Sequence, residues 1–172
     1  MNPNPSPLSE IVRVNQIGAG LSRTLTPDAD IRKKIARELD LVSLDAFEAD
    51  MSLTPAGAGW RLKGRVKAEA VQSCSLTLEP LPATIDQTFA LDLAEGVEST
   101  PDVEVTIDDD APDPVEDGKI DLGQYAVEQL ALSLDPFPRK AGAEFVQPPE
   151  PNEINPFAVL KQFRPRDDEG QG

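Results

Sequence analysis

Polar and apolar residues alternate along three long stretches of the chain, and each alternation predicts a β-strand with one buried face. The stretches cover residues 47–53, 60–78 and 84–93. Proline and glycine at residues 55–59 supply a turn between the first two stretches, which therefore form a hairpin. The second strand is unusually long, so we expect the sheet to bend.

The hairpin has a definite register if the apolar residues of its two strands face the same core. In that register Asp50 lies opposite Arg65 and Glu48 lies opposite Lys67. Cross-strand pairs of this kind contribute about 0.2–1 kcal/mol each. We therefore expect part of the charge on this face to be neutralised within the sheet.

Two segments carry the signals of helices. The first begins near Thr26, which we expect to be the N-cap, with Pro27 at the first helical position. The second is capped by Asp121, runs over residues 121–134 and is apolar on more than one face, which predicts that it covers the core. Shorter strands are expected at residues 11–14, 21–25 and 103–107.

These elements predict an α+β fold with two helices packed on a bent antiparallel sheet or partly open barrel of about five or six strands. We expect a disordered N-terminus at residues 1–8 and a single domain at 9–135. Within the domain, residues 92–118 read as a disordered acidic loop region. A proline-rich tail follows at residues 136–172, with a short helix near 155–163.

The charge of the chain is strongly negative and unevenly placed. Sixteen basic and 31 acidic side chains give a net charge of −15, and residues 68–118 hold fourteen acidic side chains and no basic one. Such a molecule is poorly suited to bind RNA over a broad surface. With no His and a single Cys, the sequence excludes Ser-His-Asp and Cys-His catalytic pairs, and we expect no catalytic residue, cofactor or metal site.

The acidic block is suited to attract a basic protein, because electrostatic steering raises the rate of association. Apolar residues of the tail add a hydrophobic contact. The candidate partner-binding residues are Asp108, Asp109, Asp110, Asp113, Glu116, Asp117, Phe157, Leu160 and Phe163.

Two clusters of basic residues are candidates for contact with RNA, one on a strand and one on the first helix. They are Arg61, Lys63, Arg65 and Lys67, and Arg32, Lys33, Lys34 and Arg37. Solvated basic faces are also common on strands and helices without any ligand, and half of the strand cluster faces acidic residues in the predicted register.

Three segments together resemble the YceD family, the large ribosomal RNA subunit accumulation proteins. They are residues 71–80, 117–138 and 155–160, and the middle segment, with its Ile-Asp-Leu start and Pro-x-Pro end, is the most specific. Family-motif residues that we expect to be structural are Cys74, Asp121, Leu122, Gly123, Leu130, Pro136 and Pro138. Many members carry a Cys-x-x-Cys pair, but here the second position is Thr77, which argues against a zinc site.

The resemblance implies a non-enzymatic factor that supports accumulation or processing of large-subunit ribosomal RNA and ribosome assembly. The expected partners are a basic large-subunit ribosomal protein and also 23S precursor rRNA if a basic face is free. A protein-only assembly scaffold and a metal-dependent enzyme acting on rRNA or nucleotides remain as alternatives. The N-terminal residues have neither a basic start nor an apolar stretch, so we expect a cytoplasmic protein that does not enter a membrane.

Overall fold

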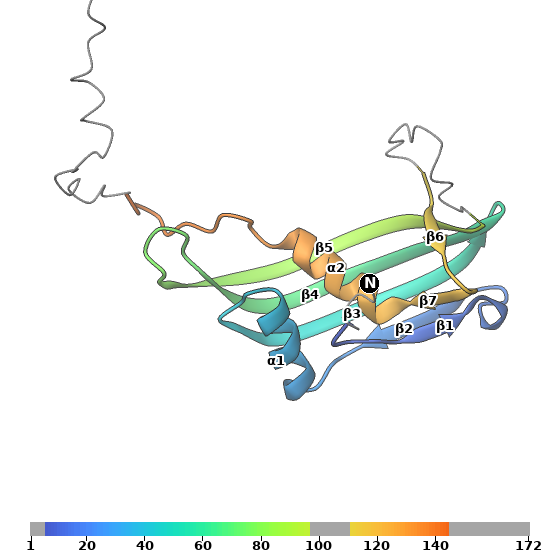
Figure 1. The fold of residues 1–172 in the computed structure, drawn as a ribbon, viewed down its shortest axis with the longest axis horizontal. Coiled ribbons are helices and arrows are strands. Elements are labelled where there is room, and N and C mark those ends of the chain that lie inside the picture. Colours follow the sequence, from blue (N-terminus) through green and yellow to red (C-terminus); the bar gives the residue numbers. More distant parts are fainter. Residues whose placement is uncertain (1–5, 97–110, 145–172) are drawn as a thin grey trace, which may run out of the picture.

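The computed structural model describes residues 6–96 and 111–144 and confirms the α+β class. A five-stranded sheet has the strand order β2-β3-β4-β5-β6 and does not close into a barrel. Its long strands lie side by side and bend together (Figure 1). The strands are β2 (Leu21–Leu25), β3 (Ser43–Ala56), β4 (Gly59–Ser73), β5 (Pro80–Glu95) and β6 (Asp113–Val115).

A second, two-stranded sheet joins the start of the chain to the region before the last helix. Its strands β1 (Ile11–Arg13) and β7 (Lys119–Asp121) pair antiparallel, with Val12 opposite Ile120. A short 3-10 turn, η1 (Val14–Gln16), follows β1. Both Val12 and Ile120 are buried, so this small sheet is part of the same hydrophobic core as the large one.

The register predicted for the hairpin of β3 and β4 is confirmed. Glu48 pairs with Lys67 and Asp50 with Arg65 along the ladder. The apolar parity also holds, since Leu53 and Leu62 lie opposite each other and are fully buried. The sheet is mixed rather than wholly antiparallel, because β6 pairs parallel to β5.

Helix α1 (Ala29–Glu38) begins two residues later than predicted. Asp28, not Thr26, is the N-cap, and its carboxylate accepts hydrogen bonds from the backbone N–H groups of Asp30 and Ile31 at 3.0 and 2.9 Å. Pro27 therefore precedes the helix instead of opening it. The carboxylate of Asp28 satisfies two otherwise free helical N–H groups, which favours this later start.

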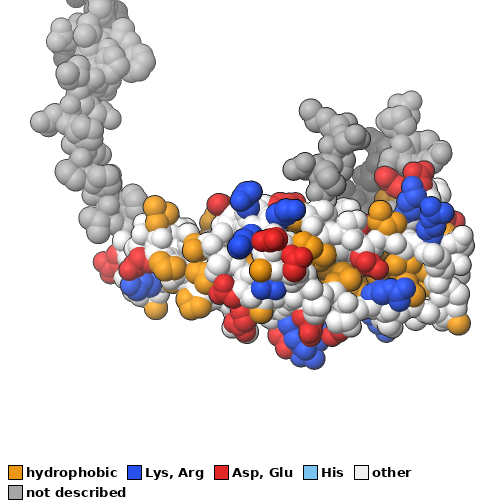
Figure 2. Space-filling view, turned by 90° about the horizontal axis from the view of Figure 1, so that it is seen from below, with side chains coloured by type: hydrophobic (Ala, Val, Ile, Leu, Met, Phe, Trp, Pro, Cys, Tyr) orange, Lys and Arg blue, Asp and Glu red, His pale blue; other side chains and the backbone are white. Residues whose placement is uncertain are grey.

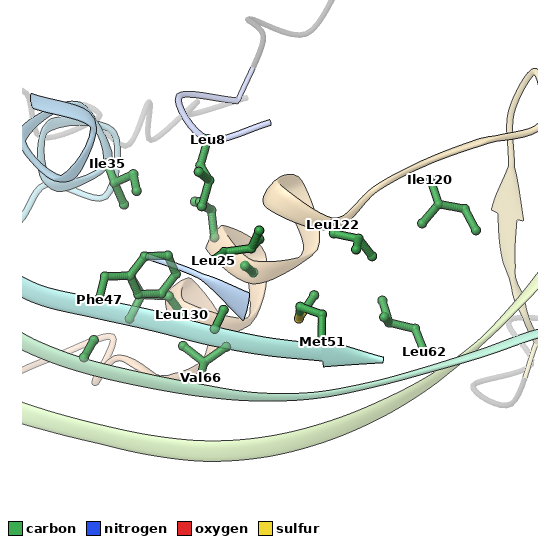
Figure 3. Packing of buried hydrophobic residues seen from close by; sticks show 14 of the residues in the cluster. Leu8, Leu25, Ile35, Phe47, Met51, Leu62, Val66, Ile120, Leu122 and Leu130 are labelled. Atoms are coloured by element: carbon green, nitrogen blue, oxygen red, sulfur yellow. The ribbon is translucent and has the colours of Figure 1, made fainter. Parts of the chain in front are cut away.

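Helix α2 (Leu122–Ser133) begins after Asp121, as predicted. Both helices lie over one face of the large sheet, where Phe47, Met51 and Val66 point toward them (Figure 3). Leu122 and Leu130 of α2 are almost completely buried, which fits the predicted role of this helix as the main cover of the core. No helix in residues 6–96 or 111–144 is long and apolar enough to cross a membrane.

The acidic loop region expected at residues 92–118 is structured at both of its ends. Strand β5 continues to Glu95, and β6 pairs with its last three residues. The strand expected at residues 103–107 lies outside the described residues, as do the tail beyond residue 144 and the short helix near 155–163.

Candidate functional site

An acidic groove of about 520 Å³ lies where β6, β7 and the first turns of α2 meet. Asp113, Glu116 and Asp117, three of the candidate partner-binding residues, line it together. Glu128 of α2 and Ile11 of β1 also line it, and neither is among the site residues predicted from the sequence. The remaining lining residues are Pro114, Val115, Lys119, Ile120, Asp121, Gln124 and Tyr125.

A tight turn places the acidic side chains of this groove. Asp117 and Gly118 both adopt left-handed backbone conformations, with φ of 52° and 63°. An Asp-Gly pair with two positive φ angles is typical of a two-residue hairpin turn. The turn brings Glu116 opposite Lys119, whose backbone N–H donates to the Glu116 carbonyl at 3.0 Å. The Asp117-Gly118 dipeptide is the sequence signal that could have predicted this hairpin.

The groove combines negative charge with exposed apolar surface. Ile11 is 58% exposed at its edge. The pKa of Tyr125 is raised to about 12 by burial and by the negative charges of Asp113 and Glu128, which reflects the negative potential of the groove. Such a surface can receive a cationic segment that also carries an apolar side chain.

The acidic groove is not neutralised by its own chain within the part that the structure describes. Asp113, Glu116, Asp117 and Glu128 form no ion pair there, and Lys119 is the one basic residue of the lining. The groove therefore carries several negative charges against a single positive one. This local excess is what attraction of a basic partner requires.

Other carboxylates of the acidic block are paired internally, which reduces the extent of the negative surface expected from the sequence. Asp92 accepts two hydrogen bonds from Arg61 at 2.7 Å each, and Asp86 accepts two from Arg65 at 2.6 Å each. Glu79 forms an ion pair with Lys140 at 2.9 Å. Figure 2 shows positive and negative side chains interspersed on one face of the molecule.

The basic strand cluster is consequently largely neutralised by carboxylates of the same sheet. Hydrogen bonds to Asp92 and Asp86 raise the pKa values of Arg61 and Arg65, respectively. Lys67 forms an ion pair with Glu48, with 3.5 Å between Nζ and Oε1. Lys63 forms no ion pair within the described residues. RNA could use the other three side chains only by breaking existing ion pairs.

The basic cluster on α1 is less neutralised. Lys33 has one exposed ion pair with Asp30 at 3.6 Å, a distance and exposure at which such pairs contribute little. Lys34 and Arg37 are exposed and form no ion pair with any described residue. The half-buried Arg32 donates from Nη1 to the Pro27 carbonyl at 2.8 Å.

Cys74, a residue of the family motif, lies in the turn between β4 and β5 and is fully buried. Hydrogen bonds from the Thr77 side chain and from the backbone N–H groups of Lys140, Leu76 and Thr77 lower the pKa of its thiol to about 7. In residues 6–96 and 111–144, no group of three or more Cys, Asp and Glu side chains is arranged to hold a metal ion.

The remaining family-motif residues hold the ends of α2. Leu122 is buried, and a Cβ at Gly123 would lie 2.5 Å from the Leu8 carbonyl oxygen, so only glycine allows this close approach. Beyond α2, the Pro138 carbonyl accepts a hydrogen bond from the Ser75 N–H at 2.8 Å. Pro136 lies in the same exposed segment.

Several candidate residues lie outside the described part of the chain. They are Asp108, Asp109, Asp110, Phe157, Leu160 and Phe163.

Together, the open sheet, its two covering helices and the acidic groove define a small acidic protein of the α+β class. Comparison with known proteins gives its family. The family model described as large ribosomal RNA subunit accumulation protein YceD matches residues 62–164, more than half of the chain, and the chain belongs to the YceD family. This confirms the resemblance seen in the sequence. The family name implies a role in accumulation of large-subunit ribosomal RNA, and so in ribosome biogenesis. No curated protein and no solved structure matched the chain.

Proposed function

We propose that this protein supports accumulation of large-subunit ribosomal RNA without catalysing a reaction, by holding a basic large-subunit ribosomal protein in the acidic groove. The observation that carries the proposal is the concentration, around one hollow, of carboxylates that form no ion pair with any described residue. Asp113, Glu116, Asp117 and Glu128 surround it, and Lys119 alone opposes them. In this account the protein acts in the cytoplasm, where ribosomes assemble.

The chemistry of the groove favours a protein partner over RNA. Phosphate groups would meet carboxylates there, which is repulsive, whereas Lys and Arg side chains would find acceptors. The exposed apolar surface of Ile11 adds a contact that a basic protein segment with an aliphatic or aromatic side chain can use.

Precursor 23S rRNA is a second candidate partner. Basic side chains of α1 that form no ion pair with any described residue favour that helix as its point of contact. Lys34 and Arg37 are exposed, while Arg61 and Arg65 on β4 are held by Asp92 and Asp86. If RNA binds, replacing Lys34 and Arg37 by Ala should weaken its binding and reduce its dependence on salt. Unchanged RNA binding in this variant would place the RNA contact elsewhere on the protein, whereas absence of RNA binding by the unmodified chain would make the protein a protein-only scaffold.

The groove is tested by measuring the affinity of the full chain for each purified large-subunit ribosomal protein at moderate salt. A triple variant, Glu116→Gln with Asp117→Asn and Glu128→Gln, removes three charges from the groove. We expect at least one basic ribosomal protein to bind the unmodified chain and to bind the triple variant about tenfold more weakly.

The matched control removes three charges elsewhere, by Asp30→Asn, Glu38→Gln and Asp45→Asn near α1. These residues are exposed and lie outside the groove. The control should retain most of the affinity. Equal weakening by the two triple variants would show that only net charge matters, and the absence of binding to every basic large-subunit protein would reject the proposal.

A further inference from the structure

A long edge of the large sheet has no neighbouring strand within the described residues. Strand β5 pairs with β4 from Pro80 to Leu93, but on its other edge it pairs with β6 only at Leu93–Glu95. In Figure 1 the strand forms one margin of the sheet, with β6 at one end. Residues 83–92 therefore present a row of backbone donors and acceptors that no described strand occupies. Such rows are templates for pairing with a further strand.

This edge lacks the features that usually prevent pairing between molecules. Prolines are confined to its start, at residues 80 and 82, and residues 83–91 contain one charged side chain, Asp86. The charge of Asp86 is already compensated by Arg65, whose guanidinium binds it through two hydrogen bonds. The stretch is rich in Thr, Ile, Phe and Leu, which favour β-structure.

The side chains of the edge are complementary to a second copy of themselves. Two copies of β5 related by a two-fold axis pair antiparallel. Residues directly opposite each other point to the same face of a sheet. Each face therefore continues into the same face of the partner only if one residue, the one at the axis, lies opposite its own copy. An axis at residue 86 or 89 would place Asp86 opposite Asp86 or Asp92. An axis at Gln87 or Thr88 avoids both repulsive pairs and lies nearest the middle of residues 83–92, so these two axes pair the most residues of the edge.

Either of the two permitted axes improves apolar burial. With the axis at Gln87, Ile85 lies opposite Phe89. With the axis at Thr88, Ile85 lies opposite Leu91. Phe89 and Leu91 are only half-buried in the single chain, so a second copy would cover apolar surface that the first leaves open. Apolar cross-strand pairs of this kind stabilise the pairing of two strands.

We propose that this protein forms a two-fold symmetric dimer through antiparallel pairing of residues 83–92 of β5, giving a continuous sheet across two chains. The acidic groove is lined by none of these residues, so the two surfaces are distinct. Because each chain carries a net charge of −15, salt should strengthen the dimer. A partner held by the acidic groove should instead be weakened by salt.

The first test is crosslinking of the full chain with single cysteines at the edge. With the axis at Gln87, the variant Gln87→Cys places a cysteine opposite its own copy, and with the axis at Thr88 the variant Thr88→Cys does so. The two Cα atoms would then be roughly 4.5–5.5 Å apart, a separation that a disulfide can span. We expect one of the two variants to form an interchain disulfide under mild oxidation. The control variant Ser52→Cys, in the middle of β3, should not, and the buried Cys74 of the unmodified chain should remain free.

The second test is sedimentation equilibrium over a range of protein concentrations. The double variant Gln87→Glu with Thr88→Glu places like charges opposite each other under both axes. With the axis at residue 87, Glu faces Glu at position 87 and the new Glu at position 88 faces Asp86. With the axis at residue 88, Glu faces Glu at position 88. We expect it to weaken association about tenfold or more, whereas Ser52→Glu with Thr54→Glu, which adds the same charge on β3, should not.

Three results would overturn the proposal. One is a monomer at every concentration with no crosslink at residue 87 or 88. Another is a dimer that the edge variant leaves intact, which would place the interface elsewhere. The third is strong hydrogen-exchange protection of the free edge in a monomer, which would show that the chain covers this edge itself.

Discussion

The carboxylate of Asp121 accepts a hydrogen bond from the hydroxyl of Ser9 at 2.6 Å, across 112 positions of the chain. The same carboxylate accepts from the backbone N–H groups of Glu10 and Gly123 at 2.8 and 2.9 Å. One side chain thus caps α2 and fastens the start of the chain to it. The Ile-Asp-Leu segment thus joins the two ends of the described fold.

Replacing Asp121 by Ala should destabilise the fold by about 2 kcal/mol, because the cap and the link to Ser9 and Glu10 are lost together. The free energy of unfolding, measured in urea, checks this. Asp121→Asn keeps one acceptor oxygen and should cost less. Equal stability of the Ala variant and the unmodified chain would show that the cap does not hold these elements.

Gly64 lies opposite Phe89 in the ladder of β4 and β5, and the aromatic ring occupies the space that a Cβ at Gly64 would need. The Sδ atom of Met51 would be 2.8 Å from that Cβ. Gly64→Ala should therefore destabilise the protein by about 1–3 kcal/mol.

Phe89→Leu removes the ring and should recover part of this loss. A double-mutant cycle on the free energy of unfolding measures the coupling between the two positions. Additive effects of the two substitutions would contradict the packing of Phe89 against Gly64.

The ion pairs of β4 and β5 should make the protein sensitive to acid. Hydrogen bonds from Arg65 and Arg61 lower the pKa values of Asp86 and Asp92 below the ordinary aspartate value. A carboxyl with a lowered pKa in the folded state stabilises the fold above its unfolded pKa of about 3.9, and this contribution disappears as pH falls through the folded value.

Stability should therefore drop as pH falls below about 4, and the drop should be shallower in a variant with Asp86→Asn and Asp92→Asn. Thermal unfolding at a series of pH values checks the difference. Since both pairs are exposed, high salt should reduce it. Identical pH profiles for the two proteins would rule out a contribution from these pairs.

The Cys74 thiol should titrate near neutral pH, and its pKa should depend on the side chain of Thr77. Its pKa is lowered to about 7, first of all by the hydrogen bond from the Thr77 side chain. Thr77→Val removes that donor at nearly constant volume and should raise the pKa. Thiolate absorbance in the ultraviolet as a function of pH measures it, with Thr77→Ser as a control that keeps the hydroxyl. An unchanged titration in the Val variant would refute this role.

The strand pattern was predictable because local alternation determines it. Once the apolar residues of β3 and β4 are required to face one core, only one register remains, and Glu48 opposite Lys67 follows directly. The predicted start of α1 was wrong because Thr26 and Asp28 are both favourable N-cap residues, and the sequence alone does not determine which of them caps the helix.

Contacts between distant segments were not predictable from local pattern. Arg65 faces Asp50 across the hairpin, yet its guanidinium binds Asp86 from β5, which is a diagonal neighbour. Strands as short as β6 and β7 give too few residues for an alternation to appear. The groove that they build with α2 therefore emerged only from the fold, although the Asp117-Gly118 turn was present in the sequence.

The central claim, that the acidic groove supports accumulation of large-subunit ribosomal RNA, is tested most directly in cells that lack the protein. The ratio of large-subunit to small-subunit ribosomal RNA would be measured after the unmodified chain, the groove variant (E116Q, D117N and E128Q) or the control variant (D30N, E38Q and D45N) is supplied at equal levels. We predict that the unmodified chain and the control restore the ratio and that the groove variant does not. Full restoration by the groove variant would contradict the account.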